Sequence, residues 1–127
     1  IIHHSAYSGG FVSPGVSGVA DYLQLGLLPR IFGADMSIFV SYGGRFTFTE
    51  EQCKRISSYI KRPMGLMKAA CPAPGGGVTD ARLNELVELY GNDTMFLVGG
   101  DMFRRGPDIE ANMSYFVERL TKLSERT

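Results

Sequence analysis

The chain of 127 residues is long enough for one domain with a buried core. It has 13 Lys and Arg against 13 Asp and Glu, and this formal net charge of zero argues against binding of nucleic acid or an anionic membrane surface. Its apolar runs are much shorter than a membrane span, and no secretory signal is recognisable at its start.

The two cysteines, Cys53 and Cys71, lack the spacing of a metal or redox motif. Free cysteine usually serves as a small packed side chain. We therefore expect two free thiols, in a protein of the reducing cytoplasm.

Four short apolar runs predict buried parallel strands, at residues 1–3, 36–40, 65–70 and 94–98. They recur about every 30 residues, which is the length of a βα unit. The first run begins at Ile1 itself, so we expect the chain to be part of a longer protein.

Helical patterns fill the intervals between these runs. Residues 16–32 carry apolar side chains at helical spacing, and Pro29 predicts a kink or a new turn there. Residues 49–60 open on Thr49 as an N-cap, with two acidic residues in the first turn.

Two further helices are predicted in the second half of the chain. Residues 79–90 open on Thr79 as a cap and stop at Gly91. Residues 107–123 begin with Pro107 in the first turn. The expected apolar face of this last helix consists of Ile109, Met113, Phe116, Val117 and Leu120. The element order is β-α repeated four times, which predicts an α/β fold with a parallel sheet.

Each predicted strand is followed by small, flexible residues, at positions 8–10, 42–45, 74–77 and 99–101. Parallel α/β proteins bind their ligands at the carboxyl ends of the strands, so we infer a working face there. Backbone N–H groups in glycine turns and at helix N-termini suit phosphate best. One glycine cluster alone usually makes only a tight turn, but four clusters on one face favour a ligand site.

A family resemblance lies in three segments: HHSAYSGG, GADMSIFVSYGGRF and PAPGGGVTDARLNELVELYGNDTMFLVGGD. Together they resemble the large subunit of ribulose-bisphosphate carboxylase/oxygenase (RuBisCO), and more closely its non-carboxylating relatives, the RuBisCO-like proteins. The resemblance implies that residues 1–127 form the C-terminal half of a TIM (β/α)8 barrel, strands 5 to 8 with their helices. The N-terminal half of the barrel would then be absent from this chain.

The resemblance also implies roles for particular residues. His4 matches a catalytic histidine beside the metal-bound substrate, and Arg45 stands where the family has a lysine that meets substrate. Arginine keeps that charge and adds a fork suited to phosphate. One substrate phosphate would be held by the backbone N–H groups of four glycines: Gly76, Gly77, Gly99 and Gly100.

Some positions depart from the carboxylases. Ser5 replaces an arginine that grips phosphate, Ser8 and Ile38 replace histidines, and Gly75 replaces a serine. The second phosphate of a bisphosphate would lose its contacts, so a substrate with one phosphate is expected.

The implied reaction is Mg²⁺-assisted removal of a proton next to the ketone of a phosphorylated keto-sugar, followed by isomerisation or a related decarboxylation. The resemblance places the metal ligands and the lysine base on the absent first four strands, so no metal ligand is assigned in this chain. Asp101 is interpreted as a supporting or helix-capping residue. The implied enzyme is a cytoplasmic homodimer, and this half alone is expected to be inactive.

Other interpretations stay open. One alternative is a true ribulose-bisphosphate carboxylase. A second is a self-associating half-barrel that binds phosphate esters without catalysis, and a third is a purely structural piece. Arg104 and Arg105 either border the phosphate entrance or form a solvated helix start, and Tyr42 and Phe46 either cover a bound substrate or only anchor their loop.

Overall fold

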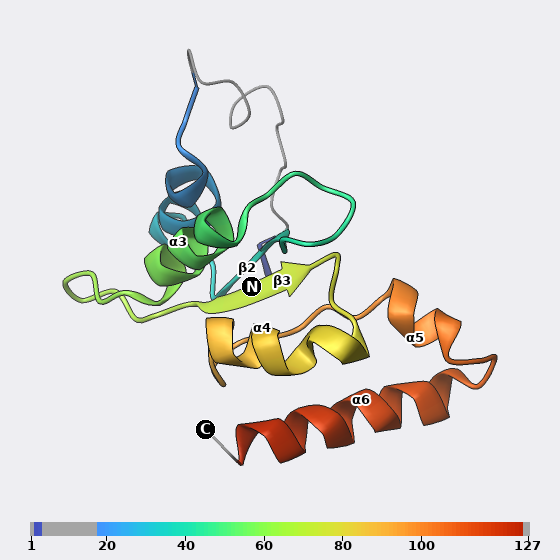
Figure 1. Ribbon diagram of the computed structural model, residues 1–127. Coiled ribbons are helices and arrows are strands. Elements are labelled where there is room, and N and C mark those ends of the chain that lie inside the picture. The colour runs from blue at the N-terminus through green and yellow to red at the C-terminus, as the bar shows by residue number, and fades with distance from the viewer. Residues whose placement is uncertain (1, 4–17, 126–127) are drawn as a thin grey trace.

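The structure is a computed structural model that describes residues 2–3 and 18–125 (Figure 1). Its elements, in chain order, are β1 (Ile2–His3), a π-helical turn (Leu23–Leu27), α2 (Leu28–Ile31), β2 (Met36–Val40), α3 (Glu50–Lys61), β3 (Cys71–Gly75), a 3-10 turn (Asp80–Arg82), α4 (Leu83–Tyr90), α5 (Gly100–Arg104) and α6 (Ile109–Ser124). None of the helices within these described ranges is long and apolar enough to cross a membrane.

The three strands form one parallel sheet in the order β1-β2-β3. Met36 of β2 pairs with Ile2 on one side and with Cys71 on the other. Figure 1 shows α4 next to β3. Helix α6 lies on the far side of α4 and packs against α4. The predicted α/β class with a parallel sheet is therefore confirmed.

The third predicted strand was misplaced. We predicted it at residues 65–70, but β3 begins at Cys71, and Leu66 is fully exposed. The chain turns there instead, and the Met67 N–H donates to the Met64 carbonyl at 2.9 Å. The prediction failed because the two prolines in the sequence CPAPG argue against a central strand.

Residues 94–98 run beside β3 without forming a complete ladder with it. The N–H groups of Met95 and Leu97 donate to the carbonyls of Pro72 and Pro74, at 2.9 and 3.1 Å. Proline has no N–H with which to return such a bond, so only half of the usual parallel ladder can form. The fourth predicted strand thus lies where we expected it, but as an irregular one.

The helical segment before β2 changes its winding next to Pro29, as predicted. It forms a π-helical turn up to Leu27, and Pro29 then lies in the first turn of α2. Pro29 cannot donate the α-helical hydrogen bond to the Leu25 carbonyl. The hydroxyl of Ser37 on β2 donates to that carbonyl at 2.6 Å, which ties the helix to the sheet.

The predicted helix ends are mostly confirmed. Thr49 caps α3 through a capping box: its hydroxyl accepts from the Gln52 N–H at 3.2 Å, and the Gln52 side chain accepts from the Thr49 N–H at 2.9 Å. Gly91 ends α4 with a φ of 76°. Thr79 is the N-cap residue of the 3-10 turn that leads into α4, as its predicted position requires, but its side chain makes no capping bond.

The last helix is rotated relative to the prediction. Asp108 is its N-cap, so Pro107 lies just before the helix rather than in its first turn. Phe116 is 2% exposed, but Val117 of the same predicted face is 56% exposed. Ile109 and Met113 are also exposed. The buried face runs instead through Asn112, Phe116 and Leu123.

The core lies between the sheet and helices α3 and α4. Phe39 of β2 and Tyr90 of α4 meet edge to face, with their ring centres 5.9 Å apart. The Tyr90 hydroxyl hydrogen-bonds to the Ser41 hydroxyl at 3.2 Å, and Ile56 of α3 is fully buried. The burial of these side chains fixes the end of β2, from which the candidate site begins.

Both cysteines are free thiols, as predicted. Cys53 is fully buried in α3, and this burial raises the pKa of its thiol. Cys71, at the start of β3, is partly exposed.

Candidate functional site

The carboxyl ends of β2, β3 and the last extended segment meet at one edge of the sheet. The Ser41 N–H donates to the Gly75 carbonyl at 2.8 Å, and Gly75 forms a parallel bridge with Leu97. Three of the predicted glycine clusters therefore lie side by side. The cluster at 8–10 and the predicted catalytic His4 lie outside the described residues.

Gly44 and Gly77 bring two of these loops into backbone contact. A Cβ atom on Gly44 would lie 2.9 Å from the Gly77 nitrogen, and one on Gly77 would lie 2.7 Å from the Gly44 nitrogen. Gly77 also has a φ of 70°, in the left-handed region that other residues rarely adopt. A side chain at either position would push the loops apart, so these glycines do more than make tight turns.

Arg45 lies next to the glycine loops, because it packs on Phe46 and Phe46 packs on the loop after β3. The guanidinium carbon of Arg45 lies 5.0 Å from the centre of the Phe46 ring. That ring in turn lies 3.8 Å from the position of a Cβ atom on Gly76, so Phe46 packs against the loop after β3. Arg45 is exposed, which leaves its charge at the surface of the glycine loops. The structure thus brings together three predicted site residues: Arg45, Gly76 and Gly77.

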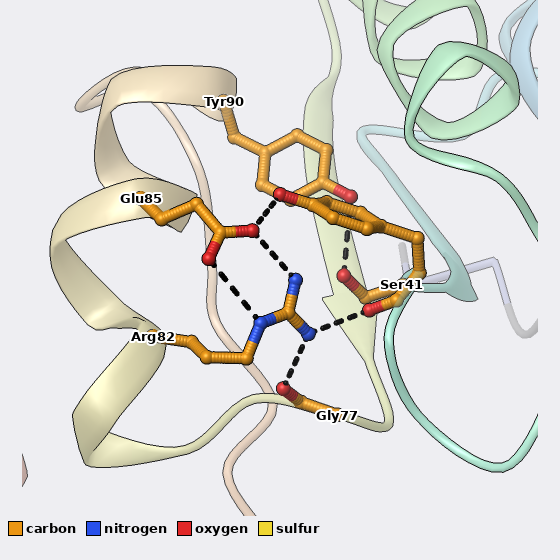
Figure 2. Close-up of polar contacts among 6 residues, drawn as sticks. Ser41, Gly77, Arg82, Glu85 and Tyr90 are labelled. Atoms are coloured by element: carbon orange, nitrogen blue, oxygen red, sulfur yellow. Dashed lines mark hydrogen bonds and ion pairs between the residues drawn. The ribbon is translucent and has the colours of Figure 1, made fainter.

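Figure 2 shows a polar network centred on Arg82, which joins two of these loops. Its Nη1 donates to the carbonyls of Tyr42 and Gly77, at 2.7 and 3.0 Å. Its Nη2 donates to Glu85 Oε1 at 2.8 Å, and the Tyr42 hydroxyl donates to the same carboxylate oxygen. The guanidinium also lies over the Tyr42 ring, 4.4 Å from its centre. One side chain therefore holds the loop after β2 to the loop after β3, and Tyr42 anchors its loop.

The charges of this network compensate one another. Hydrogen bonds from Arg82 and then Tyr42 hold the pKa of Glu85 below its usual range. The hydrogen bond to Glu85 raises the pKa of Arg82. Burial, followed by Glu85, raises the pKa of Tyr42 to about 12. At neutral pH Arg82 is a cation, Glu85 an anion and Tyr42 a neutral donor, so Glu85 balances the charge of Arg82 locally.

A second network joins the loop after β3 to the loop after residues 94–98. The Asp101 carboxylate accepts from the Asp80 N–H at 2.8 Å, so Asp101 caps the 3-10 turn that leads into α4. The Asp80 carboxylate accepts from the Tyr115 hydroxyl at 2.8 Å and from Arg119 Nε at 3.2 Å. These two hydrogen bonds, Tyr115 first, lower the pKa of Asp80. Asp101 thus has the supporting or capping role that the sequence suggested, but for this neighbouring turn and not for its own helix, α5, whose N-cap is Gly99.

Gly99 and Gly100 immediately precede that cap. Gly99 is the N-cap of α5 and Gly100 is its first residue. Arg104 pairs with Asp101 at 3.5 Å, and the guanidinium of Arg105 lies 3.4 Å from the centre of the Tyr115 ring. Both arginines thus have their partners in the second network, beside the glycines of the 99–101 loop.

Sequence reasoning missed Arg82 and Glu85. On a helix, they look like an ordinary exposed ion pair at i, i+3. Only the fold shows that Arg82 contacts Tyr42, 40 residues earlier in the chain.

No family model matches the chain, but curated relatives do. Ribulose bisphosphate carboxylase-like protein 1 of Rhodopseudomonas palustris is 37% identical over 102 residues, which cover 80% of this chain and 28% of the relative. The 5-methylthioribulose-1-phosphate isomerase of Rhodospirillum rubrum is 31% identical over 112 residues, which cover 88% of this chain and 30% of the relative. The 2,3-diketo-5-methylthiopentyl-1-phosphate enolase of Exiguobacterium sibiricum is 31% identical over 100 residues, with coverages of 79% and 25%.

A solved structure agrees with these relatives. The rubisco-like protein MtnW from Alicyclobacillus acidocaldarius matches 99% of this chain and 32% of its own, with a TM-score of 0.86 and 26% identity. The chain is homologous to the RuBisCO-like proteins. This confirms the family expected from the sequence. The chain spans between 25% and 32% of the length of these RuBisCO-like proteins.

The RuBisCO-like family implies Mg²⁺. Within residues 2–3 and 18–125, no group of three His, Cys, Asp or Glu side chains lies close enough together to hold a metal ion. Three acids beside the glycine loops, Asp80, Glu85 and Asp101, already accept hydrogen bonds from protein donors. The described part of the chain therefore does not fit a magnesium site by itself.

Proposed function

We propose that the protein carrying this chain is a RuBisCO-like enolase or isomerase that acts on a phosphorylated keto-sugar. The named activities of two relatives, an isomerase of 5-methylthioribulose 1-phosphate and an enolase of 2,3-diketo-5-methylthiopentyl 1-phosphate, support this class of substrate. We further propose that this chain is the C-terminal half of the barrel, strands 5 to 8. In this proposal the rest of the protein supplies the N-terminal half, and the enzyme is a cytoplasmic homodimer.

In this proposal the chain supplies the phosphate site. The backbone N–H groups of the loops after β3 and after residues 94–98 bind the phosphate, with the guanidinium of Arg45 beside them. The observation that carries the proposal is the backbone contact of Gly44 with Gly77 next to Arg45, because it joins two glycine loops and a cation at one edge. The glycines assigned to the phosphate are Gly76, Gly77, Gly99 and Gly100.

The phosphate would contribute to catalysis from a distance. The reaction breaks a C–H bond next to the ketone, passes the proton to a base and leaves negative charge on the carbonyl oxygen. The base and any Mg²⁺ ligands come from outside this chain, and Mg²⁺, when bound, would stabilise that oxygen. His4 is proposed to lie beside the reacting carbonyl. Contacts with the phosphate hold the substrate in the geometry that proton removal needs.

The test is exchange of substrate hydrogen with solvent deuterium, followed by mass spectrometry on the whole protein with Mg²⁺ present. We expect 5-methylthioribulose 1-phosphate to gain deuterium and 5-methylthioribulose without the phosphate to gain little. Removal of Mg²⁺ with a chelator should stop the exchange. Equal exchange of both sugars would contradict the phosphate site. Lack of exchange in both sugars, and also in 2,3-diketo-5-methylthiopentyl 1-phosphate assayed in the same way, would contradict the enolase and isomerase class.

A matched pair of variants locates the site. Gly99→Val should raise KM for the phosphorylated substrate about tenfold, because a side chain there crowds the proposed phosphate contact. Gly33→Val is the control, since Gly33, in the turn before β2, has open space around it like Gly99. Its φ of 87° makes the control the more strained of the two variants, because Gly99 has a φ of -115°. An unchanged KM for Gly99→Val would show that this loop does not bind the phosphate.

A further inference from the structure

We infer that Arg82 is a positioning residue that sets the geometry of the proposed phosphate site, by holding the loop after β2 against the Gly77 loop. The inference rests on the proposed function and adds a residue that does not touch the substrate. Arg82 is chosen because its side chain hydrogen-bonds to both loops.

The donors of Arg82 are largely used by protein acceptors. A guanidinium has five N–H donors. Two hydrogen bonds go to the Tyr42 and Gly77 carbonyls, and two more go to the Glu85 carboxylate, from Nη2 at 2.8 Å and from Nε at 3.5 Å. The Glu85 carboxylate also balances the positive charge. Arg82 is therefore built as a strut between loops rather than as a phosphate ligand.

The loop after β2 packs directly on this strut. Tyr42 gives Arg82 its carbonyl and the face of its ring, and a Cβ atom on the next residue, Gly43, would clash with the guanidinium. The following residue, Gly44, is the one that contacts Gly77. The hydrogen bonds of Arg82 thus lie within two residues of the contact between the loops.

This placement makes the spacing of the two loops depend on Arg82. Glycines have no side chains that could interlock, so a contact between Gly44 and Gly77 by itself leaves the loops free to slide. Two hydrogen bonds from one nitrogen, to a carbonyl on each loop, fix that spacing. A displacement of about 1 Å is enough to weaken a positioned contact with substrate. Loss of Arg82 should then weaken phosphate binding without removing any group that touches phosphate.

The test compares variants of the whole protein by two measurements. One is the dissociation constant for inorganic phosphate, followed by ³¹P NMR, which needs no turnover. The other is KM and kcat with 5-methylthioribulose 1-phosphate. Arg82→Met should raise the dissociation constant and KM about tenfold and leave kcat within about twofold. Arg82→Lys can bridge the two carbonyls but cannot also hold Glu85 in a fork, so it should fall between the wild type and Arg82→Met.

Arg55→Met is the matched control. Arg55 also lies over a tyrosine, 5.1 Å from the centre of the Tyr22 ring, and pairs with the carboxylate of Asp21 at 3.9 Å. It stands in α3, and it forms no hydrogen bond or ion pair with the described glycine loops at residues 42–45, 74–77 and 99–101. Arg55→Met should leave phosphate binding and KM unchanged, whatever it does to the melting temperature.

The outcomes separate this inference from the proposed function. If Arg82→Met or, where that variant does not fold, Arg82→Lys lowers the melting temperature but keeps wild-type phosphate binding and KM, Arg82 is only structural and the inference is wrong. Gly77→Val distinguishes the inference about Arg82 from the proposed phosphate site. If the site exists, Gly77→Val should weaken phosphate binding even when the Arg82 variants do not. If Gly77→Val also binds phosphate normally, or the wild type binds none, the proposed phosphate site is wrong and the inference falls with it.

Discussion

Arg30 and Arg82 both donate hydrogen bonds to backbone carbonyls of separate segments, but at opposite edges of the sheet. Arg30, in α2, donates from Nη1 to the carbonyls of Tyr59 and Arg62 at 2.9 and 2.8 Å, and from Nη2 to the carbonyl of Lys68 at 2.9 Å. These acceptors lie at the end of α3 and in the chain leading to β3, at the amino edge. Arg82 joins carbonyls at the carboxyl edge, where the glycine loops lie.

The partners of the two arginines explain the difference between these regions. The carbonyls that Arg30 holds lie at and after the end of α3, and Arg30 is 4% exposed. Burial, together with Arg62, lowers its pKa. Arg82 holds glycine-loop carbonyls and has the Glu85 carboxylate beside it. The same group therefore closes a helix end at one edge and sets the spacing of loops at the other, and only the second position should affect substrate.

The largest expected effect tests the amino edge. Arg30→Met leaves three backbone carbonyls without their donor, which should cost about 3 kcal/mol of unfolding free energy. We expect a lower urea midpoint for the whole protein and an unchanged KM. A raised KM in folded Arg30→Met would show that the two edges are coupled, and would break the division between them.

The next effect tests the carboxyl edge. Gly77→Val places a branched side chain at a φ of 70° and within 2.7 Å of the Gly44 nitrogen, so kcat/KM should fall about 100-fold. Gly65→Val is the control, because Gly65 also has a positive φ, 54°, but nothing lies within 4 Å of its Cβ position. Equal losses of kcat/KM in the two variants would mean that strain, and not the site, causes the loss.

Local features of the fold were predictable from the sequence. Residues 36–40 have the apolar pattern of a buried strand, and Thr49 and Gly91 cap their helices through neighbours within one turn. The position of β3 was not predictable in this way. Pro72 and Pro74 are tolerated because their carbonyls accept from the next segment, a condition set by residues more than 20 positions later.

The candidate site likewise has a part that was predictable from the sequence and a part that depends on distant residues. Gly76 and Gly77 were predicted because they follow a strand, and the carboxyl ends of parallel strands converge. The role of Arg45 was predicted from the family resemblance. Arg82 and Asp80 were not, since their partners, Tyr42 and Tyr115, are 40 and 35 residues away. A charged residue on a helix gives no sign in the sequence of which loop it will contact.

A smaller effect compares the two cysteines. Cys71 lines a cavity of about 890 Å³ at the amino edge, together with Lys61 and Val87, whereas Cys53 is fully buried in the core. The raised pKa of Cys53 also keeps its thiol protonated, and the thiolate is the reactive form. Native protein should therefore be alkylated by iodoacetamide at Cys71 at least about tenfold faster than at Cys53, as followed by peptide mass spectrometry.

Denatured protein is the control for this comparison, because both cysteines should then react at similar rates. Faster reaction at Cys53 in the native protein would contradict the packing of α3 against the sheet. Protection of both cysteines would show that the amino edge is covered in the whole protein.

The smallest expected effect separates the two halves of the Arg82 network. Tyr42→Phe removes the hydroxyl that donates to Glu85 but keeps the backbone carbonyl that accepts from Arg82, so KM should rise less than in Arg82→Met. The tyrosine pKa is about 10 in an unfolded chain, and that of Tyr42 is raised to about 12 in the fold. Between these pH values the unfolded chain gives up a proton that the folded chain keeps, so stability falls as the pH rises.

Tyr42→Phe should therefore flatten the loss of stability over this pH window, measured as the urea midpoint at each pH. Tyr90, whose pKa burial also raises, keeps its own contribution in both proteins. An unchanged alkaline slope in Tyr42→Phe would mean that the hydroxyl is not held in the network. A KM as high as that of Arg82→Met would mean that the bond from Tyr42 to Glu85, and not the bond from Arg82 to the Tyr42 carbonyl, sets the spacing of the loops.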